Sequence, residues 1–258
     1  MQFYFITVKT KAIMIVHIYG HPCDMDPIME IARKHNLKVI EDCAEAHGAL
    51  YKNKKVGSFG DIAAFSFYSN KIITTGEGGM LVTNDESLAN RARWLHSLAF
   101  DKERRFIHEE IGFNFRMTNL QAAIGLAQLE KIDDIINKKR EIARTYNQFL
   151  NNVEGIQTPY ESEDVKNVYW MYAIIIEDNF GISRDELKEK LSEAGIETRF
   201  FFSPLHQQPC FKENNYNPED FPVSIEISKK GLYLPSGLNL TSEQIESISK
   251  LIIESKRN

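Results

Sequence analysis

The stretch VIEDCAEAHGALYKNKKVGSFGDIAAFSFYSNKIITTGEGGM, residues 39–80, decides the fold. It opens on an apolar run that ends in an acidic residue, Asp42. Further along, Ser66 stands between two aromatic residues, and Lys71 comes shortly before the Gly-rich turn at 74–79. Each feature is ordinary by itself, so their meaning depends on the segments around them.

The flanking segments predict a mostly parallel sheet. An apolar, β-branched run at 12–18 suits a strand buried on both faces, and Asp24 with Pro27 opens a helix. The next strand, 37–40, ends at Glu41 and Asp42, so the unit is a right-handed parallel crossover. Two more strands are expected at 62–68 and 79–83. Ligands gather at the carboxyl ends of such strands, where Asp42 lies.

The second half of the chain has a different pattern. A helix is expected over 84–98, and a long helix over 120–150 with a bend near 132–134. Strands follow at 168–176, 197–202 and 233–235, with helices beginning at the capping residues Ser183 and Thr241. We therefore predict a large α/β domain over residues 1–133 and a small α+β domain over residues 134–258.

Composition narrows the class of protein. The 258 residues carry a net charge of −5 with both signs interspersed, which argues against nucleic acid as a partner. Three scattered cysteines without a CxxC pair argue against a disulfide framework and a zinc site, and favour a reducing compartment. No stretch approaches the ~20 apolar residues of a membrane helix. We expect a cytoplasmic protein without a metal.

Lys71, Asp42 and Ser66 together point to pyridoxal phosphate. A shielded lysine with a lowered pKa can form a Schiff base, and the pyridine nitrogen of this cofactor needs a carboxylate partner. Each residue also has a plainer interpretation. Lys71 could be a solvated strand-end lysine, Asp42 a turn or helix-capping residue, and Ser66 a small strand residue. His47 could pack near the ring, although a lone histidine after a strand is more often structural.

The motifs EDCAEAHGA, GSFGD, FSFYSNK, TTGEGGMLVTND and GFNFRMTNLQAAIG, in this order, resemble the DegT/DnrJ/EryC1/StrS family of nucleotide-sugar aminotransferases. The resemblance implies the aspartate-aminotransferase fold, which is fold type I of the pyridoxal-phosphate enzymes. It also implies that Lys71 carries the cofactor, Asp42 pairs with the pyridine nitrogen and Ser66 holds the phosphate. Asn114 and Arg116 would reach across a homodimer interface, the first to the phosphate and the second to substrate.

Two details are similar to the GDP-perosamine-forming branch of the family. Glu45 stands where many members carry Gln, and NVYWMYAII covers residues 167–175. Glu45 would then contact the cofactor, although it could also be a surface residue without a ligand. His206 matches a family position and is expected to bind substrate. The branch implies transfer of the amino group of L-glutamate to C4 of GDP-4-keto-6-deoxymannose, a step of O-antigen and lipopolysaccharide synthesis.

The N-terminal part of the family pattern is not found in this sequence. That part includes a Ser/Asn-Gly-Thr segment that grips the phosphate and an aromatic residue that stacks on the ring. Residues 1–5 do not resemble the family either. Two alternatives to an active enzyme therefore stay open: a shortened, inactive product, and a non-catalytic partner of a full-length homologue or a separate N-terminal piece.

Overall fold

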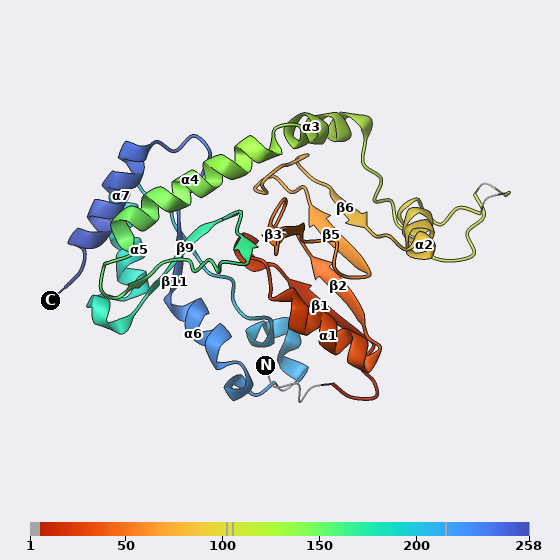
Figure 1. The fold of residues 1–258 in the computed structure, drawn as a ribbon, viewed down its shortest axis with the longest axis horizontal. Helices are drawn as coiled ribbons and strands as arrows, with labels where there is room; N and C mark the ends of the chain where they lie inside the picture. Colours follow the sequence, from red (N-terminus) through yellow and green to blue (C-terminus); the bar gives the residue numbers. More distant parts are fainter. Residues whose placement is uncertain (1–5, 102, 105, 215, 258) are drawn as a thin grey trace. The chain divides into compact units, whose positions relative to one another are not determined.

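A four-stranded sheet carries the predicted site in the computed structural model, which describes residues 6–101, 103–104, 106–214 and 216–257 (Figure 1). The strands are β1 (Ala12–Val16), β2 (Lys38–Asp42), β5 (Ile62–Ser66) and β6 (Gly79–Val82), in the order β1-β2-β5-β6. The first three are parallel and β6 runs antiparallel to β5. The mostly parallel sheet is confirmed. Residues 1–5, which we expected not to resemble the family, lie outside the described residues.

One face of this sheet is covered by α1 (Met25–His35), which runs beside β1 and β2 in Figure 1. Ile15 of β1 packs with Met25 and Ile28 of the helix in one buried cluster. The helix ends because Asn36 takes a left-handed conformation, with φ of 51°. This β1-α1-β2 unit is the predicted crossover, and it brings Asp42 to the carboxyl end of the sheet.

Three further helices follow the sheet: α2 (Glu86–His96), α3 (Asn119–Leu129) and α4 (Ile132–Leu150). The bend expected near 132–134 is a break between α3 and α4, so the single long helix of the prediction is two helices. A hairpin that the sequence reasoning did not predict, β3 (Leu50–Tyr51) with β4 (Lys54–Lys55), pairs with β8 (Val165–Lys166). Its turn uses Lys52 and Asn53 at positive φ.

The remaining strands form an antiparallel sheet in the order β10-β11-β9-β7. They are β7 (Ile156–Gln157), β9 (Tyr172–Ile176), β10 (Arg199–Phe200) and β11 (Gly231–Leu234). The helices of this part are α5 (Arg184–Glu193), α6 (Pro222–Lys230) and α7 (Ser242–Glu254). Capping boxes at Ser183 and Thr241 begin α5 and α7, as predicted.

The chain divides into two compact units. One holds the parallel sheet and comprises the residues up to Ile136 together with Glu161–Trp170; the other comprises Asn137–Tyr160 and the residues from Met171 onward. Within the described part of the chain, no helix is both long and apolar enough to cross a membrane. Each contact discussed below joins residues of the same unit.

Candidate active site

The carboxyl ends of β2 and β5 place two predicted residues on one face of the sheet. Asp42 pairs in register with Ala64, and Ser66 follows two residues later on β5. Because side chains alternate along a strand, Asp42, Ala64 and Ser66 share a face. Asp42 Oδ1 accepts a hydrogen bond from the Ala44 N–H at 3.0 Å, and Ser66 Oγ accepts one from the Tyr68 N–H at 3.3 Å. Both side chains are partly exposed, and so accessible to a ligand.

Lys71 lies in the turn between β5 and β6, with its amine largely shielded from solvent. Its side chain is 12% exposed, and Nζ lies 3.8 Å from Glu45 Oε1 and 4.0 Å from the centre of the Trp170 ring. Glu45 Oε2 accepts a hydrogen bond of 2.6 Å from the Tyr19 N–H. The structure thus brings together Lys71 and Glu45, two of the predicted site residues, and adds Trp170 and Tyr19.

Burial shapes the protonation of this pair. The pKa of Lys71 lies below its ordinary value because burial disfavours the ammonium, an effect that the charges of Glu45 and Asp42 partly offset. The pKa of Glu45 is raised, again through burial first, against the Tyr19 N–H and the Lys71 charge. A lowered amine pKa favours the neutral nucleophile that Schiff-base chemistry requires.

His47 is buried between aromatic rings and lies 5.4 Å from Phe65 and 5.8 Å from Phe67, measured between ring centres. Burial first, and then the Lys71 charge, lower the pKa of His47 to about 4, so the ring is neutral at pH 7. Both ring nitrogens are buried without a hydrogen-bond partner among the described residues. Packing near the cofactor ring and a structural role both stay predictions for His47.

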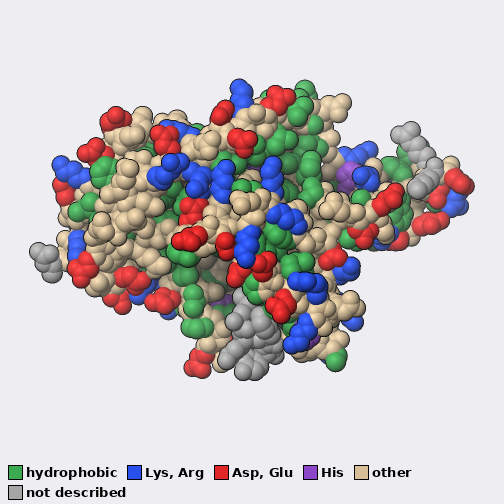
Figure 2. All heavy atoms as spheres, in the orientation of Figure 1, with side chains coloured by type: hydrophobic (Ala, Val, Ile, Leu, Met, Phe, Trp, Pro, Cys, Tyr) green, Lys and Arg blue, Asp and Glu red, His purple; other side chains and the backbone are tan. Residues whose placement is uncertain are grey.

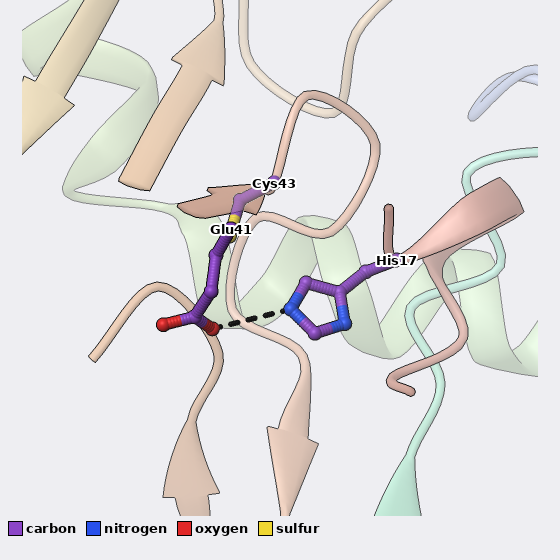
Figure 3. A group of neighbouring side chains, drawn as sticks. All are labelled: His17, Glu41 and Cys43. Carbon is purple, nitrogen blue, oxygen red and sulfur yellow. Dashed lines mark hydrogen bonds and ion pairs between the residues drawn. The ribbon is translucent and has the colours of Figure 1, made fainter. Parts of the chain in front are cut away.

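Glu41, the neighbour of Asp42, points to the opposite face and is fully buried. Its carboxylate accepts hydrogen bonds from three backbone N–H groups, those of Gly57, Phe59 and Gly60, at 2.6–2.7 Å. His17 Nε2 lies 3.2 Å from the same carboxylate (Figure 3). Burial raises the pKa of Glu41, but the bonds from His17 and the three N–H groups outweigh it, so the pKa lies below its usual range.

His17, Glu41 and Cys43 form a compact group whose potential ligand atoms lie within 4.8 Å of one another (Figure 3). The hydrogen bonds explain this grouping without a metal. His17 Nδ1 accepts the Cys23 N–H at 3.0 Å, so Nε2 carries the proton and donates to Glu41. Burial raises the pKa of the Cys43 thiol, which therefore stays protonated. His17 and Glu41 are thus joined by a hydrogen bond at the end of β2, and the Cys43 thiol lies beside them.

Asn114 and Arg116 lie on an exposed segment before α3, and Arg116 Nε donates to Asn114 Oδ1 at 3.2 Å. Both residues line a groove of about 1010 Å³, whose other walls are β5, β6 and α2. Ala64 and Gly79 lie in the same groove, so it extends along the face that bears Asp42 and Ser66. The structure places Asn114 and Arg116 on this groove and shows no contact between them and Lys71.

His206 belongs to the second unit, in the short turn Leu205–Gln207. Its ring stacks on Phe221, with ring centres 4.4 Å apart and planes inclined by 19°. The buried Nε2 has no hydrogen-bond partner among the described residues. The predicted substrate-binding role of His206 stays a prediction.

The sequence reasoning gave no role to Tyr19, Glu41 or Trp170. Trp170 lay within the quoted NVYWMYAII motif, and its position 99 residues after Lys71 gave no sign of contact. Tyr19 carries no local signal, because it contributes a backbone N–H in an unusual conformation, with φ of 54°. Glu41 could have been noticed as a charged residue inside an apolar strand, which is rarely left without partners.

The chain is similar to known proteins over almost all of its length. GDP-perosamine synthase of Escherichia coli O157:H7 is 48% identical over 249 residues, which cover 96% of this chain and 66% of that protein. GDP-perosamine synthase of Caulobacter vibrioides is 45% identical, covering 94% of this chain and 65% of its own length. The crystal structure of DesV from S. venezuelae superposes with a TM-score of 0.90 at 32% identity, covering 98% of this chain and 67% of that one.

The fold is that of the pyridoxal-phosphate-dependent sugar aminotransferases, in agreement with the predicted fold type I. Residues 4–252 match the DegT/DnrJ/EryC1/StrS aminotransferase family, and the chain belongs to that family. It spans about two thirds of the length of the curated relatives it matches. Pyridoxal phosphate is the cofactor that this family implies, and it is part of the name of EpsN of Bacillus subtilis, a relative that is 37% identical. The residues present fit the cofactor: a shielded amine, a carboxylate and a hydroxyl at adjacent strand ends.

Proposed function

We propose that this chain works in a pyridoxal-phosphate-dependent aminotransferase that moves the amino group of L-glutamate to a nucleotide-linked 4-keto-6-deoxy sugar. The acceptor is GDP-4-keto-6-deoxymannose, aminated at C4 to give GDP-perosamine. The observation that carries the proposal is the shielded Lys71 amine beside Glu45, at the carboxyl edge that bears Asp42. The choice of acceptor is supported by the names of the two synthases that are 45% and 48% identical.

Bound pyridoxal phosphate supplies an electron sink that stabilises negative charge on the carbon next to the transferred nitrogen. In our proposal Asp42 holds the proton on the pyridine nitrogen, and the Ser66 hydroxyl and Asn114 bind the phosphate. Lys71 would hold the cofactor through Nζ, and the same Nζ would move a proton between the cofactor carbon and the sugar carbon, as general base and acid. Arg116 and His206 bind substrate.

We further propose a homodimer whose partner supplies Asn114 and Arg116 to the site. Both residues are exposed and precede α3, whose Leu120, Ile124 and Leu126 are 80%, 53% and 58% exposed. Figure 2 shows hydrophobic side chains gathered over this helix. Exposed apolar surface of this kind marks interaction sites. We place the enzyme in the cytoplasm, in the synthesis of O-antigen precursors.

Covalent attachment of the cofactor tests the role of Lys71. We expect pyridoxal phosphate, fixed on the purified chain with borohydride, to label Lys71 in mass spectra, and Lys71→Ala to lose that label. Lys139 gives a matched control, because it is another shielded lysine whose pKa burial lowers, to about 8. Lys139→Arg should keep the label on Lys71. Equal labelling of wild type and Lys71→Ala would refute the assignment.

Amine transfer tests the function itself. We expect the chain with glutamate and GDP-4-keto-6-deoxymannose to release 2-oxoglutarate and form the amino sugar nucleotide, and Lys71→Ala to form none. Attachment of the cofactor without transfer would leave the Lys71 assignment intact. It would refute catalysis by this chain alone, and favour a chain that needs a homologue or a separate piece.

A further inference from the structure

Lys71 is held in a closed ring of contacts with three residues from separate parts of the sequence. Its amine lies over the Trp170 ring and 3.8 Å from Glu45. Tyr19 closes the ring, because its N–H donates to Glu45 and its side chain stacks on Trp170, with ring centres 6.1 Å apart and planes inclined by 14°. All four residues belong to the unit that contains the parallel sheet.

Trp170 contacts the Lys71 turn through both the face and the edge of its side chain. Its Nε1–H donates to the carbonyl of Asn70, the residue before the lysine, at 2.7 Å. Its backbone N–H donates to the Tyr19 carbonyl at 3.1 Å. The residue is only 4% exposed. One side chain therefore fixes the backbone of the turn through its edge, and contacts the lysine amine through its face.

The backbone conformation of Tyr19 allows it to bond to both Glu45 and Trp170. Its φ of 54° lies in the left-handed region, which is unfavourable for a residue with a large side chain. In this conformation its N–H points to Glu45 and its carbonyl accepts from Trp170. The next residue, Gly20, also has positive φ, and a Cβ there would lie 2.8 Å from Val168 and 3.0 Å from the Trp170 nitrogen. The close approach of these two segments therefore requires glycine.

We propose that Trp170 is a positioning residue for Lys71, whose indole face holds the amine beside Glu45 and presents it to the cofactor. The inference rests on the proposed function for its purpose, and on the contacts of this chain for its geometry. An aromatic face attracts a cation more strongly than it attracts a neutral amine. Trp170 should therefore help to set the pH at which Lys71 loses its proton.

The charged groups that face Lys71 are Glu45 and Asp42, and the neighbouring His47 is neutral at pH 7. Both carboxylates favour the charged, ammonium form of Lys71, as the Trp170 face does. Burial acts in the opposite direction and favours the neutral amine. Trp170→Leu removes both the ring face and the Nε1–H bond to Asn70, whereas Trp170→Phe removes that bond and keeps a ring face. The difference between the Lys71 pKa values of these two variants then measures the contribution of the ring face.

The experiment is a pH titration of Lys71 by amine labelling, read by mass spectrometry on the chain without cofactor. We expect Trp170→Leu to lower the labelling midpoint of Lys71 by about 0.5 to 1 pH unit, the size of a shielded cation–π contact. Trp170→Phe keeps a ring face and should restore most of the midpoint. Trp94 is the other tryptophan, and its Nε1 also donates to a backbone carbonyl, that of Phe100. Trp94→Leu should leave the midpoint of Lys71 unchanged.

Equal midpoints in wild type and Trp170→Leu, or equal loss in Trp170→Leu and Trp170→Phe, would overturn the proposal. If Trp170→Leu does not fold, the wild-type chain still gives a test. The ε-methylene protons of Lys71 should show an upfield ring-current shift in its NMR spectrum, and an ordinary shift would refute the contact. Neither measurement involves pyridoxal phosphate, so a failure here is distinct from a loss of cofactor attachment.

Discussion

Glu41 and Asp42 are adjacent acidic residues on β2, and their side chains point to opposite faces of the sheet. Glu41 faces the covered side, is fully buried and accepts bonds from three backbone N–H groups and His17. Asp42 faces the opposite side, and among the described residues its side chain accepts one bond, from Ala44. A carboxylate whose acceptor positions are filled can bind nothing further. A carboxylate with open acceptor positions can bind a cofactor.

The two sides of β2 therefore have different roles: the Glu41 side is structural, and the Asp42 side is accessible to a ligand. The Glu41 side ties the loop at 57–60 and His17 to the end of β2, and fixes where the strand stops. The Asp42 side keeps polar groups accessible at the same end. A rigid site needs both, because a ligand-binding carboxylate is only as well placed as the strand that carries it.

Removing the Glu41 carboxylate should produce the largest effect. Glu41→Ala leaves three partly buried N–H groups and a buried histidine without their acceptor, so we expect the free energy of unfolding to fall by about 3–5 kcal/mol. Urea unfolding followed by circular dichroism measures the loss. A change below about 1 kcal/mol would mean that the network contributes little to stability, and would remove the contrast with Asp42.

The second-largest effect should come from acid, which weakens the contribution of Glu41 to the stability of the fold. The pKa of Glu41 is lower in the folded chain than in the unfolded chain, so its contribution to stability is fully present above the unfolded value of about 4.3. That contribution is lost as the pH falls through the folded pKa. Urea midpoints measured from pH 7 downward should drop in this window. Glu41→Gln, which cannot ionise, should show a shallower drop, and equal slopes would contradict the assignment.

The sequence was informative about the Asp42 side of β2, but it indicated very little about the Glu41 side. The places of Asp42 at a strand end and of Lys71 before a Gly-rich turn could be predicted because both are local patterns. The break between α3 and α4 could also be anticipated from helical periodicity. Trp170 and Tyr19 meet Lys71 only through the fold, since 99 and 52 residues separate them from it in the chain. Contacts across such separations depend on register and on backbone conformation, as at Tyr19, and no short pattern encodes them.

Asp42→Asn should have the smallest effect on the fold. Asparagine keeps a side-chain oxygen for the Ala44 N–H, and the position is partly exposed, so we expect the free energy of unfolding to change by less than about 0.5 kcal/mol. The same substitution removes the negative charge that holds the pyridine proton in our proposal, and should weaken pyridoxal-phosphate attachment to Lys71. Urea unfolding and borohydride-fixed labelling measure the two effects on one preparation. A loss of stability comparable to that of Glu41→Ala would show that Asp42 also belongs to the structural network, because an acid free for a ligand contributes little to folding.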